Sequence, residues 1–141
     1  MQSDFTPNYT IEYSDNLRTL STHLKSGQTV ITDAPVDNNG KGEAFSPTDL
    51  LATSLVTCVM TILAITCNNG DAEIVNMSAE VKKVMASNPR RVDRVWAKIK
   101  VELKGGNSKE AERLERAARA CPVAKSLSPE LQQQIEFEWK Y

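Results

Sequence analysis

Two cysteines are the residues of this chain whose type and setting best suit chemistry. Cys58 lies midway along an apolar stretch that opens with Ser46-Pro47, and Cys121 opens the turn Cys121-Pro122-Val123. A cysteine thiolate is a nucleophile, and a second cysteine beside it can trap its oxidised form as a disulfide. The pair therefore indicates thiol redox chemistry, although 63 positions of sequence separate the two residues and leave their distance in space open.

Cys58 also has a purely structural interpretation. On a straight helix it shares one face with residues three, four and seven positions away, and this face is apolar. A cysteine buried in such a stripe packs as a small hydrophobic residue and is inert. The catalytic interpretation needs a cation near the sulfur, and it then makes the stripe a pocket for an apolar substrate, lined by Leu51, Leu55 and Ile62.

Cys67 and Cys121 differ in the roles that the sequence permits for them. Cys67 follows Cys58 by nine residues, which places it about 180° round a helix and ~13 Å along it, so these two cannot form a disulfide and Cys67 is assigned to packing. Cys121 either caps a helical turn that begins at Pro122, where backbone N–H groups favour a thiolate, or continues the apolar face of the preceding helix.

Composition argues against several other classes of function. The 17 Lys and Arg balance 18 Asp and Glu without a basic run, which argues against nucleic acid. A single histidine, His23, and three cysteines without a C-x-x-C pair predict no metal site, and no cofactor motif is present. The apolar stretch from Leu50 to Ile65 is interrupted by threonines and is expected to fall short of a bilayer span, so we expect a soluble, cytoplasmic protein.

The spacing of apolar residues predicts an α+β fold in one domain over residues 1–141. Residues 1–45 read as a β-meander and a polar loop, and residues 46–70 as a central helix, Pro47 to Asn68, capped by Ser46 and Asp49. Residues 71–141 read as a hairpin, a helix capped by Ser108 and a last strand, which gives the order β-β-β-α-β-β-α-β. The central helix is almost without charge, so we expect it to be buried nearly all round, in part by a partner subunit.

Four segments in order resemble the OsmC/Ohr family, that is, osmotically inducible protein C and organic hydroperoxide resistance protein. They are Thr32-Asp33-Ala34-Pro35, residues 40–50 (GKGEAFSPTDL), the helical Cys58 and Cys121-Pro122-Val123. The resemblance spans nearly the whole chain. It implies an OsmC-like fold in which antiparallel sheets surround a long central helix within an intertwined homodimer.

The resemblance also implies a thiol-dependent peroxidase that reduces organic hydroperoxides to alcohols in oxidative stress defence. Cys58 matches the peroxidatic cysteine and Cys121 the resolving cysteine, and a dithiol, of lipoyl type in many family members, would reduce their disulfide. An arginine from the N-terminal meander stands beside the peroxidatic sulfur in the family. Arg18 is the only arginine before Cys58 and is therefore the candidate.

One position departs from the family pattern. Peroxidase members carry, directly after the proline, a glutamate that pairs with the arginine, whereas this chain has Thr48 there. Glu43, in the preceding loop, and Asp49 are the candidate substitutes. The departure keeps two alternatives open: a non-catalytic dimer that binds a small apolar ligand, and a thiol redox sensor.

Overall fold

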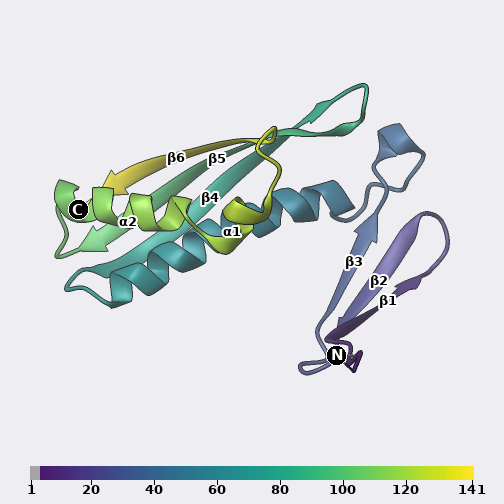
Figure 1. Ribbon diagram of the computed structural model, residues 1–141, viewed down its shortest axis with the longest axis horizontal. Helices are drawn as coiled ribbons and strands as arrows, with labels where there is room; N and C mark the ends of the chain where they lie inside the picture. The colour runs from purple at the N-terminus through teal and green to yellow at the C-terminus, as the bar shows by residue number, and fades with distance from the viewer. Residues whose placement is uncertain (1–3) are drawn as a thin grey trace. The chain divides into compact units, whose positions relative to one another are not determined.

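The structure, a computed structural model, describes residues 4–141 (Figure 1). The chain forms two compact units, of which the first ends at Leu50 and the second covers Leu51–Tyr141. One sheet of three strands lies in each unit. The elements follow the predicted α+β order, with two short additional helices, η1 (Val36–Asn38) and α3 (Pro122–Ser126).

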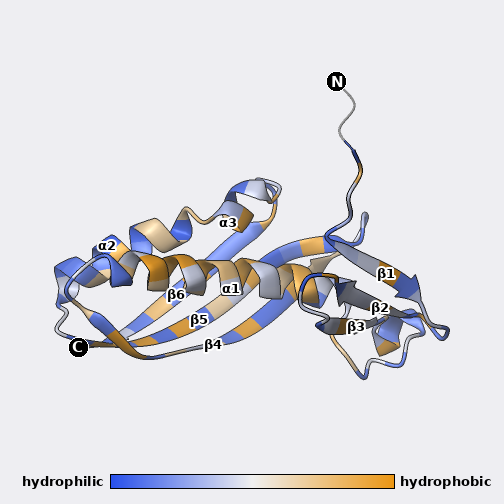
Figure 2. Cartoon of the chain, turned by 90° about the horizontal axis from the view of Figure 1, so that it is seen from below, coloured by the Kyte–Doolittle hydropathy of each residue, from blue (hydrophilic) through white to orange (hydrophobic). Residues whose placement is uncertain are grey.

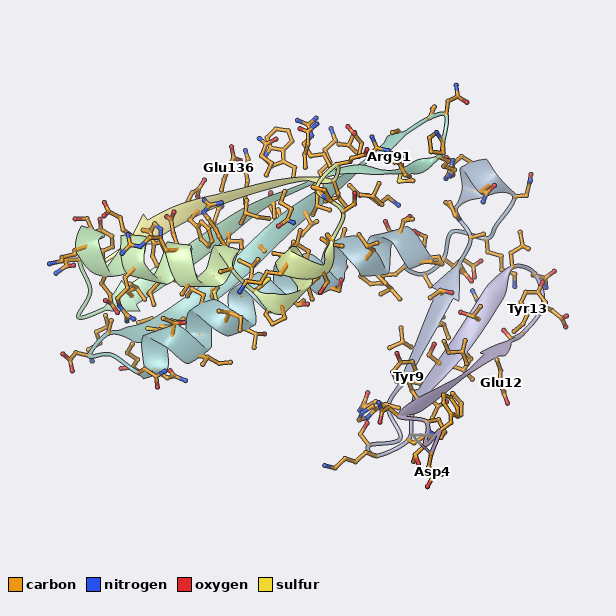
Figure 3. All side chains as sticks on the ribbon, in the orientation of Figure 1. Asp4, Tyr9, Glu12, Tyr13, Arg91 and Glu136 are labelled. Carbon is orange, nitrogen blue, oxygen red and sulfur yellow. The ribbon has the colours of Figure 1, made fainter. Side chains whose placement is uncertain are left out.

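The first unit is built on an antiparallel meander of β1 (Tyr9–Tyr13), β2 (Arg18–His23) and β3 (Thr29–Asp33), as the sequence predicts. The β2–β3 register pairs Arg18 with Asp33 at one end and Thr22 with Thr29 at the other. Large apolar side chains of the meander are exposed, and the rings of Tyr9 and Tyr13 project from β1 (Figure 3). The exposed set is Tyr9, Ile11, Tyr13, Leu24, Val30 and Ile31.

The central helix α1 runs over Pro47–Asn68, the bounds that the sequence predicts. A reciprocal capping box fixes its start: Ser46 Oγ accepts the N–H of Asp49 at 3.1 Å, and Asp49 Oδ2 accepts the N–H of Ser46 at 2.9 Å. Asn69-Gly70 follows the last turn. The helix thus begins and ends on local signals.

Burial of α1 within the single chain is one-sided, and the cover that we expect from a partner subunit stays a prediction. Its buried residues form a single stripe, whereas Ser54, Thr57, Thr61 and Ile65 are exposed. The helix is also long and apolar enough to cross a membrane by length and composition alone, so the expectation that it falls short of a bilayer span is wrong. The stripe instead belongs to the hydrophobic core: Ala52, Leu55, Val56, Val59, Leu63 and Cys67.

The second unit carries β4 (Glu73–Ala86), β5 (Arg91–Lys104) and β6 (Gln132–Lys140) in that order. The helices α1, α2 (Ser108–Arg119) and α3 cover one face of this sheet (Figure 2), and the buried apolar residues of the strands form one core cluster with those of the helices. Glu136 extends from the opposite face, where it accepts the indole N–H of Trp96 at 2.7 Å (Figure 3). The core of the unit therefore lies between helices and sheet.

Two local predictions are corrected, and the β4–β5 pairing contains a bulge. The sheet is mixed, because β6 pairs with β5 in parallel after the crossover through α2 and α3. Asn107 caps α2 in place of Ser108, its side chain accepting the N–H of Glu110 at 2.9 Å. Val75 has no register partner, because a shift between Ile74 and Asn76 leaves it in a bulge and exposed.

Candidate functional site

The second unit brings Cys58 and Cys121 together. Cys58 lies on α1 beside the buried stripe and is half-buried, and Cys121 is fully buried between α2 and α3. Cys58 packs against the core cluster to which Cys121 belongs, and it is close enough to act on the titration of the Cys121 thiol. Both thiols are free. Two cysteines that are distant in sequence are thus neighbours, which the sequence alone could not decide.

Cys121 is the N-cap of α3, one of its two predicted settings, and it also belongs to the core. Its sulfur accepts the N–H of Ala124 at 3.4 Å. Burial raises the pKa of the Cys121 thiol and the contact with Cys58 raises it further, whereas the N–H groups of Ala124 and Val123 oppose both effects. Cys121 is therefore held in its thiol form.

The residues predicted to line a substrate pocket differ in exposure. Leu51 and Ile62 are half-buried, as Cys58 is, and all three pack against the core cluster. Leu55 is fully buried within that cluster. An apolar surface therefore continues from the core to the Cys58 sulfur, and a pocket formed by these residues stays a prediction.

Arg18 is held by two carboxylates of the first unit. Asp33 binds it in a fork, with Nε to Oδ1 at 2.6 Å and Nη2 to Oδ2 at 2.8 Å. Glu43, a predicted partner, accepts from Nη2 at 3.1 Å through Oε2. Asp49, the other predicted partner, is used in the capping box of α1. Asp33 is the partner that sequence reasoning missed.

A signal for Asp33 was present in the sequence. The turn at Lys25-Ser26-Gly27 joins β2 to β3, and a hairpin folded there places Arg18 opposite Asp33. Opposite charges directly across an antiparallel pair attract each other. Reading the register, and not only the strands, would have identified the pair.

The two hydrogen bonds between Arg18 and Asp33 shift the pKa values of both side chains. The hydrogen bond from Arg18 holds the pKa of the Asp33 carboxyl below its usual range against the opposing effect of desolvation, and the N–H of Glu43 lowers it further. Asp33 in turn raises the pKa of the Arg18 guanidinium, and Glu43 adds to this. Arg18 and Asp33 are therefore both ionised at neutral pH.

The remaining candidates do not form a further centre. Cys67 is buried at the end of α1, where its thiol donates to the carbonyl of Ala72 at 3.4 Å and burial raises its pKa. His23 Nδ1 pairs with Ser26 Oγ at 2.6 Å. Within residues 4–141, no group of three or more His, Cys, Asp or Glu is placed to hold a metal ion.

Comparison with known proteins identifies the family. The OsmC-like protein family matches residues 40–136. A Psychrobacter arcticus 273-4 protein, provisionally assigned to osmotic stress induction and detoxification response, is 42% identical, with 98% of this chain and 100% of that chain covered and a TM-score of 0.89. The comparison with curated protein sequences gave no match.

Two more distant structures share the fold. The OsmC-like protein of Mycoplasma pneumoniae is 12% identical over 99% of this chain and 100% of that one, with a TM-score of 0.79. The organic hydroperoxide resistance protein OhrB of Bacillus subtilis is 17% identical over 96% and 100%, with a TM-score of 0.56. From the match over residues 40–136 and the 42% identity, the chain belongs to the OsmC-like protein family.

Proposed function

We propose that this protein is a thiol peroxidase that reduces organic hydroperoxides, with Cys58 as the peroxidatic and Cys121 as the resolving cysteine. The observation that carries the proposal is that these two free thiols share one core cluster, with Cys121 fully buried in it and Cys58 half-buried against it. Relatives of the same fold are named organic hydroperoxide resistance proteins. The core surface beside Cys58 is apolar, which suits the organic part of such a substrate.

The proposed cycle has three balanced steps. The Cys58 thiolate attacks the O–O bond of the hydroperoxide; the sulfur takes one oxygen, the other leaves with a proton as the alcohol, and Cys58 becomes a sulfenic acid. The Cys121 thiol then forms the S–S bond and water leaves. An external dithiol, for which a lipoyl type is the family expectation, is oxidised as it returns both cysteines to thiols.

Arg18 is the proposed cation for this chemistry. A guanidinium stabilises a thiolate and binds oxygen atoms through directed N–H groups. Its Nη1 group has no hydrogen-bond partner within residues 4–141, so two N–H donors remain for a ligand.

We propose a homodimer as the working form. The exposed face of α1 turns its hydroxyl groups back onto its own carbonyls: Thr57 donates to Thr53 O at 2.8 Å and Thr61 to Thr57 O at 2.8 Å. This arrangement leaves methyl groups and Ile65, which is 53% exposed, on the surface. The exposed apolar residues of the meander are a second surface of the same kind.

The test uses the reduced protein and one equivalent of cumene hydroperoxide, with disulfide mapping by mass spectrometry and dithiol-driven turnover. We expect a Cys58–Cys121 disulfide and sustained turnover. Cys58→Ser should abolish turnover, and Cys121→Ser should leave a trappable sulfenic acid at Cys58. Unreacted thiols in the wild type would contradict the proposal and favour a ligand-binding dimer, whereas stoichiometric disulfide without turnover would favour a redox sensor.

A further inference from the structure

A polar cavity of about 450 Å³ lies in the second unit, where α1 ends and α2 begins. Its walls come from the turn that follows α1, the turn between β5 and α2, and one side of α2 itself. The volume is typical of sites that hold small ligands. Neither Cys58 nor Cys121 lines the cavity, so it is separate from the thiol pair.

Three cations of α2 line this cavity at helical spacing. Lys109, Arg113 and Arg116 stand at positions i, i+4 and i+7, and they therefore share one face of the helix. With a rise of about 1.5 Å per residue, the first and the last lie about 10 Å apart along the helix axis. Like charges at this spacing repel each other and destabilise a helix. The row is therefore stabilised by any negative charge placed beside it, whether from the protein or from solution.

The protein supplies such a charge to the middle cation, Arg113. Glu110 accepts from it in a fork, with Nε to Oε2 at 2.9 Å and Nη2 to Oε1 at 2.7 Å. The hydrogen bond from Arg113 holds the pKa of the Glu110 carboxyl below its usual range, so both groups are charged at neutral pH. Nη2 also donates to the carbonyl of Thr66 in the last turn of α1 at 3.4 Å. Arg113 and Glu110 thus form a neutral pair that ties α2 to the end of α1.

Lys109 and Arg116 lack a partner of this kind. Both are exposed, and neither side chain makes a hydrogen bond or an ion pair within residues 4–141. The other charged group on the wall is Asp71, exposed in the turn after α1 and also without an ion pair in that part of the chain. Two uncommitted cations thus stand against one uncommitted carboxylate. The cavity therefore attracts anions, and the attraction grows with the charge that the anion carries.

We infer that this cavity binds a small multivalent oxyanion, a phosphate or carboxylate compound, through Lys109 and Arg116. Guanidinium and ammonium groups form charge-assisted hydrogen bonds with the oxygens of both classes of anion. The two cations lie on one helix face beside one cavity, so a single anion with two or more charged groups can reach both. This inference is independent of the proposed function. A solvated helix face that no ligand occupies is the competing explanation.

The test is calorimetric titration of the full chain with tripolyphosphate and, separately, with citrate, in buffer free of divalent cations and at an ionic strength of about 0.15 M. We expect saturable binding of at least one of these probes with a Kd below about 1 mM, and at least tenfold weaker binding of monovalent acetate. Saturation by tripolyphosphate alone would assign the cavity to phosphate compounds, and saturation by citrate alone to carboxylates. Failure of both probes to saturate the protein would overturn the inference.

Charge variants test whether the named residues hold the anion. Lys109→Gln and Arg116→Gln should each weaken tripolyphosphate binding at least fivefold, and both sites are exposed, so the core stays intact. Lys100→Gln is the matched control: it removes the same charge from an exposed position of β5 that does not line the cavity, and it should change Kd less than twofold. Asp71→Asn should tighten binding at least twofold, because it removes a charge that repels the anion. Equal losses in Lys109→Gln and Lys100→Gln would overturn the inference, since net charge alone would then explain binding.

Discussion

Asp49 and Ser46 allow a sharp separation of stability from reactivity. In the structure they form the capping box of α1, with bonds of 2.9 and 3.1 Å, whereas the family pattern makes an acid near this position a candidate partner of Arg18. Removing an N-cap side chain costs about 1 kcal/mol of unfolding free energy. Loss of an acid from the first turn of a helix costs a further 0.3–1 kcal/mol, roughly, through the helix dipole.

These costs translate into melting temperatures. With about 2.1 cal/mol/K of unfolding entropy per residue, a chain of 141 residues loses about 3 °C in Tm for each kcal/mol. We therefore expect Ser46→Ala to lower Tm by about 3 °C and Asp49→Ala by about 4 to 6 °C. Both variants should keep the catalytic efficiency toward an organic hydroperoxide within twofold of wild type.

The assay is thermal unfolding by circular dichroism at one fixed protein concentration, because a dimer melts at a temperature that depends on concentration. Ser54→Ala makes the same chemical change on the exposed face of α1 and is the matched control. It should not lower Tm, because alanine is the better helix former. A tenfold loss of activity in Asp49→Ala with an unchanged Tm would refute the reasoning and make Asp49 a functional partner of Arg18.

Three further predictions follow from the same geometry. Thr48→Glu, which restores the family carboxylate, should change catalytic efficiency less than threefold, because Asp33 already occupies the Nε–Nη2 side of Arg18; a tenfold gain in steady-state assays would contradict this. Cys67→Ala should cost about 1 kcal/mol in urea unfolding and leave peroxide turnover unchanged, since Cys67 is buried and bonded to a carbonyl; lost turnover would assign it a redox role. The lowered pKa of Asp33 stabilises the fold above the unfolded-state pKa of about 3.9, and this contribution is lost as pH falls through the native pKa. Asp33→Asn should therefore show a shallower loss of stability than wild type when urea midpoints are measured from pH 5 to pH 2.5, and parallel curves would contradict the shift.

Local signals explain what could be predicted from the sequence. The bounds of α1 follow from a capping box, a proline at the first helical position and a closing Asn69-Gly70, all within a few residues of the helix. The meander follows from short alternating strands and one clear turn. Each of these features depends on neighbours in sequence, so one sequence suffices.

Long-range pairing explains what could not be predicted. β6 is parallel to β5 because of the way the α2–α3 crossover returns the chain to the sheet. The alternation of apolar and polar residues in β6 would be the same in an antiparallel strand, so it does not predict the strand's direction. The face of α1 that is exposed in the single chain could not be located from the sequence pattern, because its threonines donate their hydroxyl groups to carbonyls of the same helix. The contact of Cys58 with Cys121 depends on the packing of α1 against α3.

Arg18 pairs with a carboxylate at the end of β3, whereas the resemblance places its partner at position 48, at the start of α1. This difference has a physical consequence. A carboxylate at position 48 would hold Arg18 through one side chain, whereas Asp33 sits at the register position directly opposite it in a ladder of five consecutive β2–β3 pairs. The backbone of both residues is therefore fixed by the hydrogen bonds of the hairpin, so little conformational freedom is lost when the two side chains pair. Asp33 and Glu43 together take up Nε and Nη2 of Arg18, so within residues 4–141 the guanidinium is held without a carboxylate at position 48.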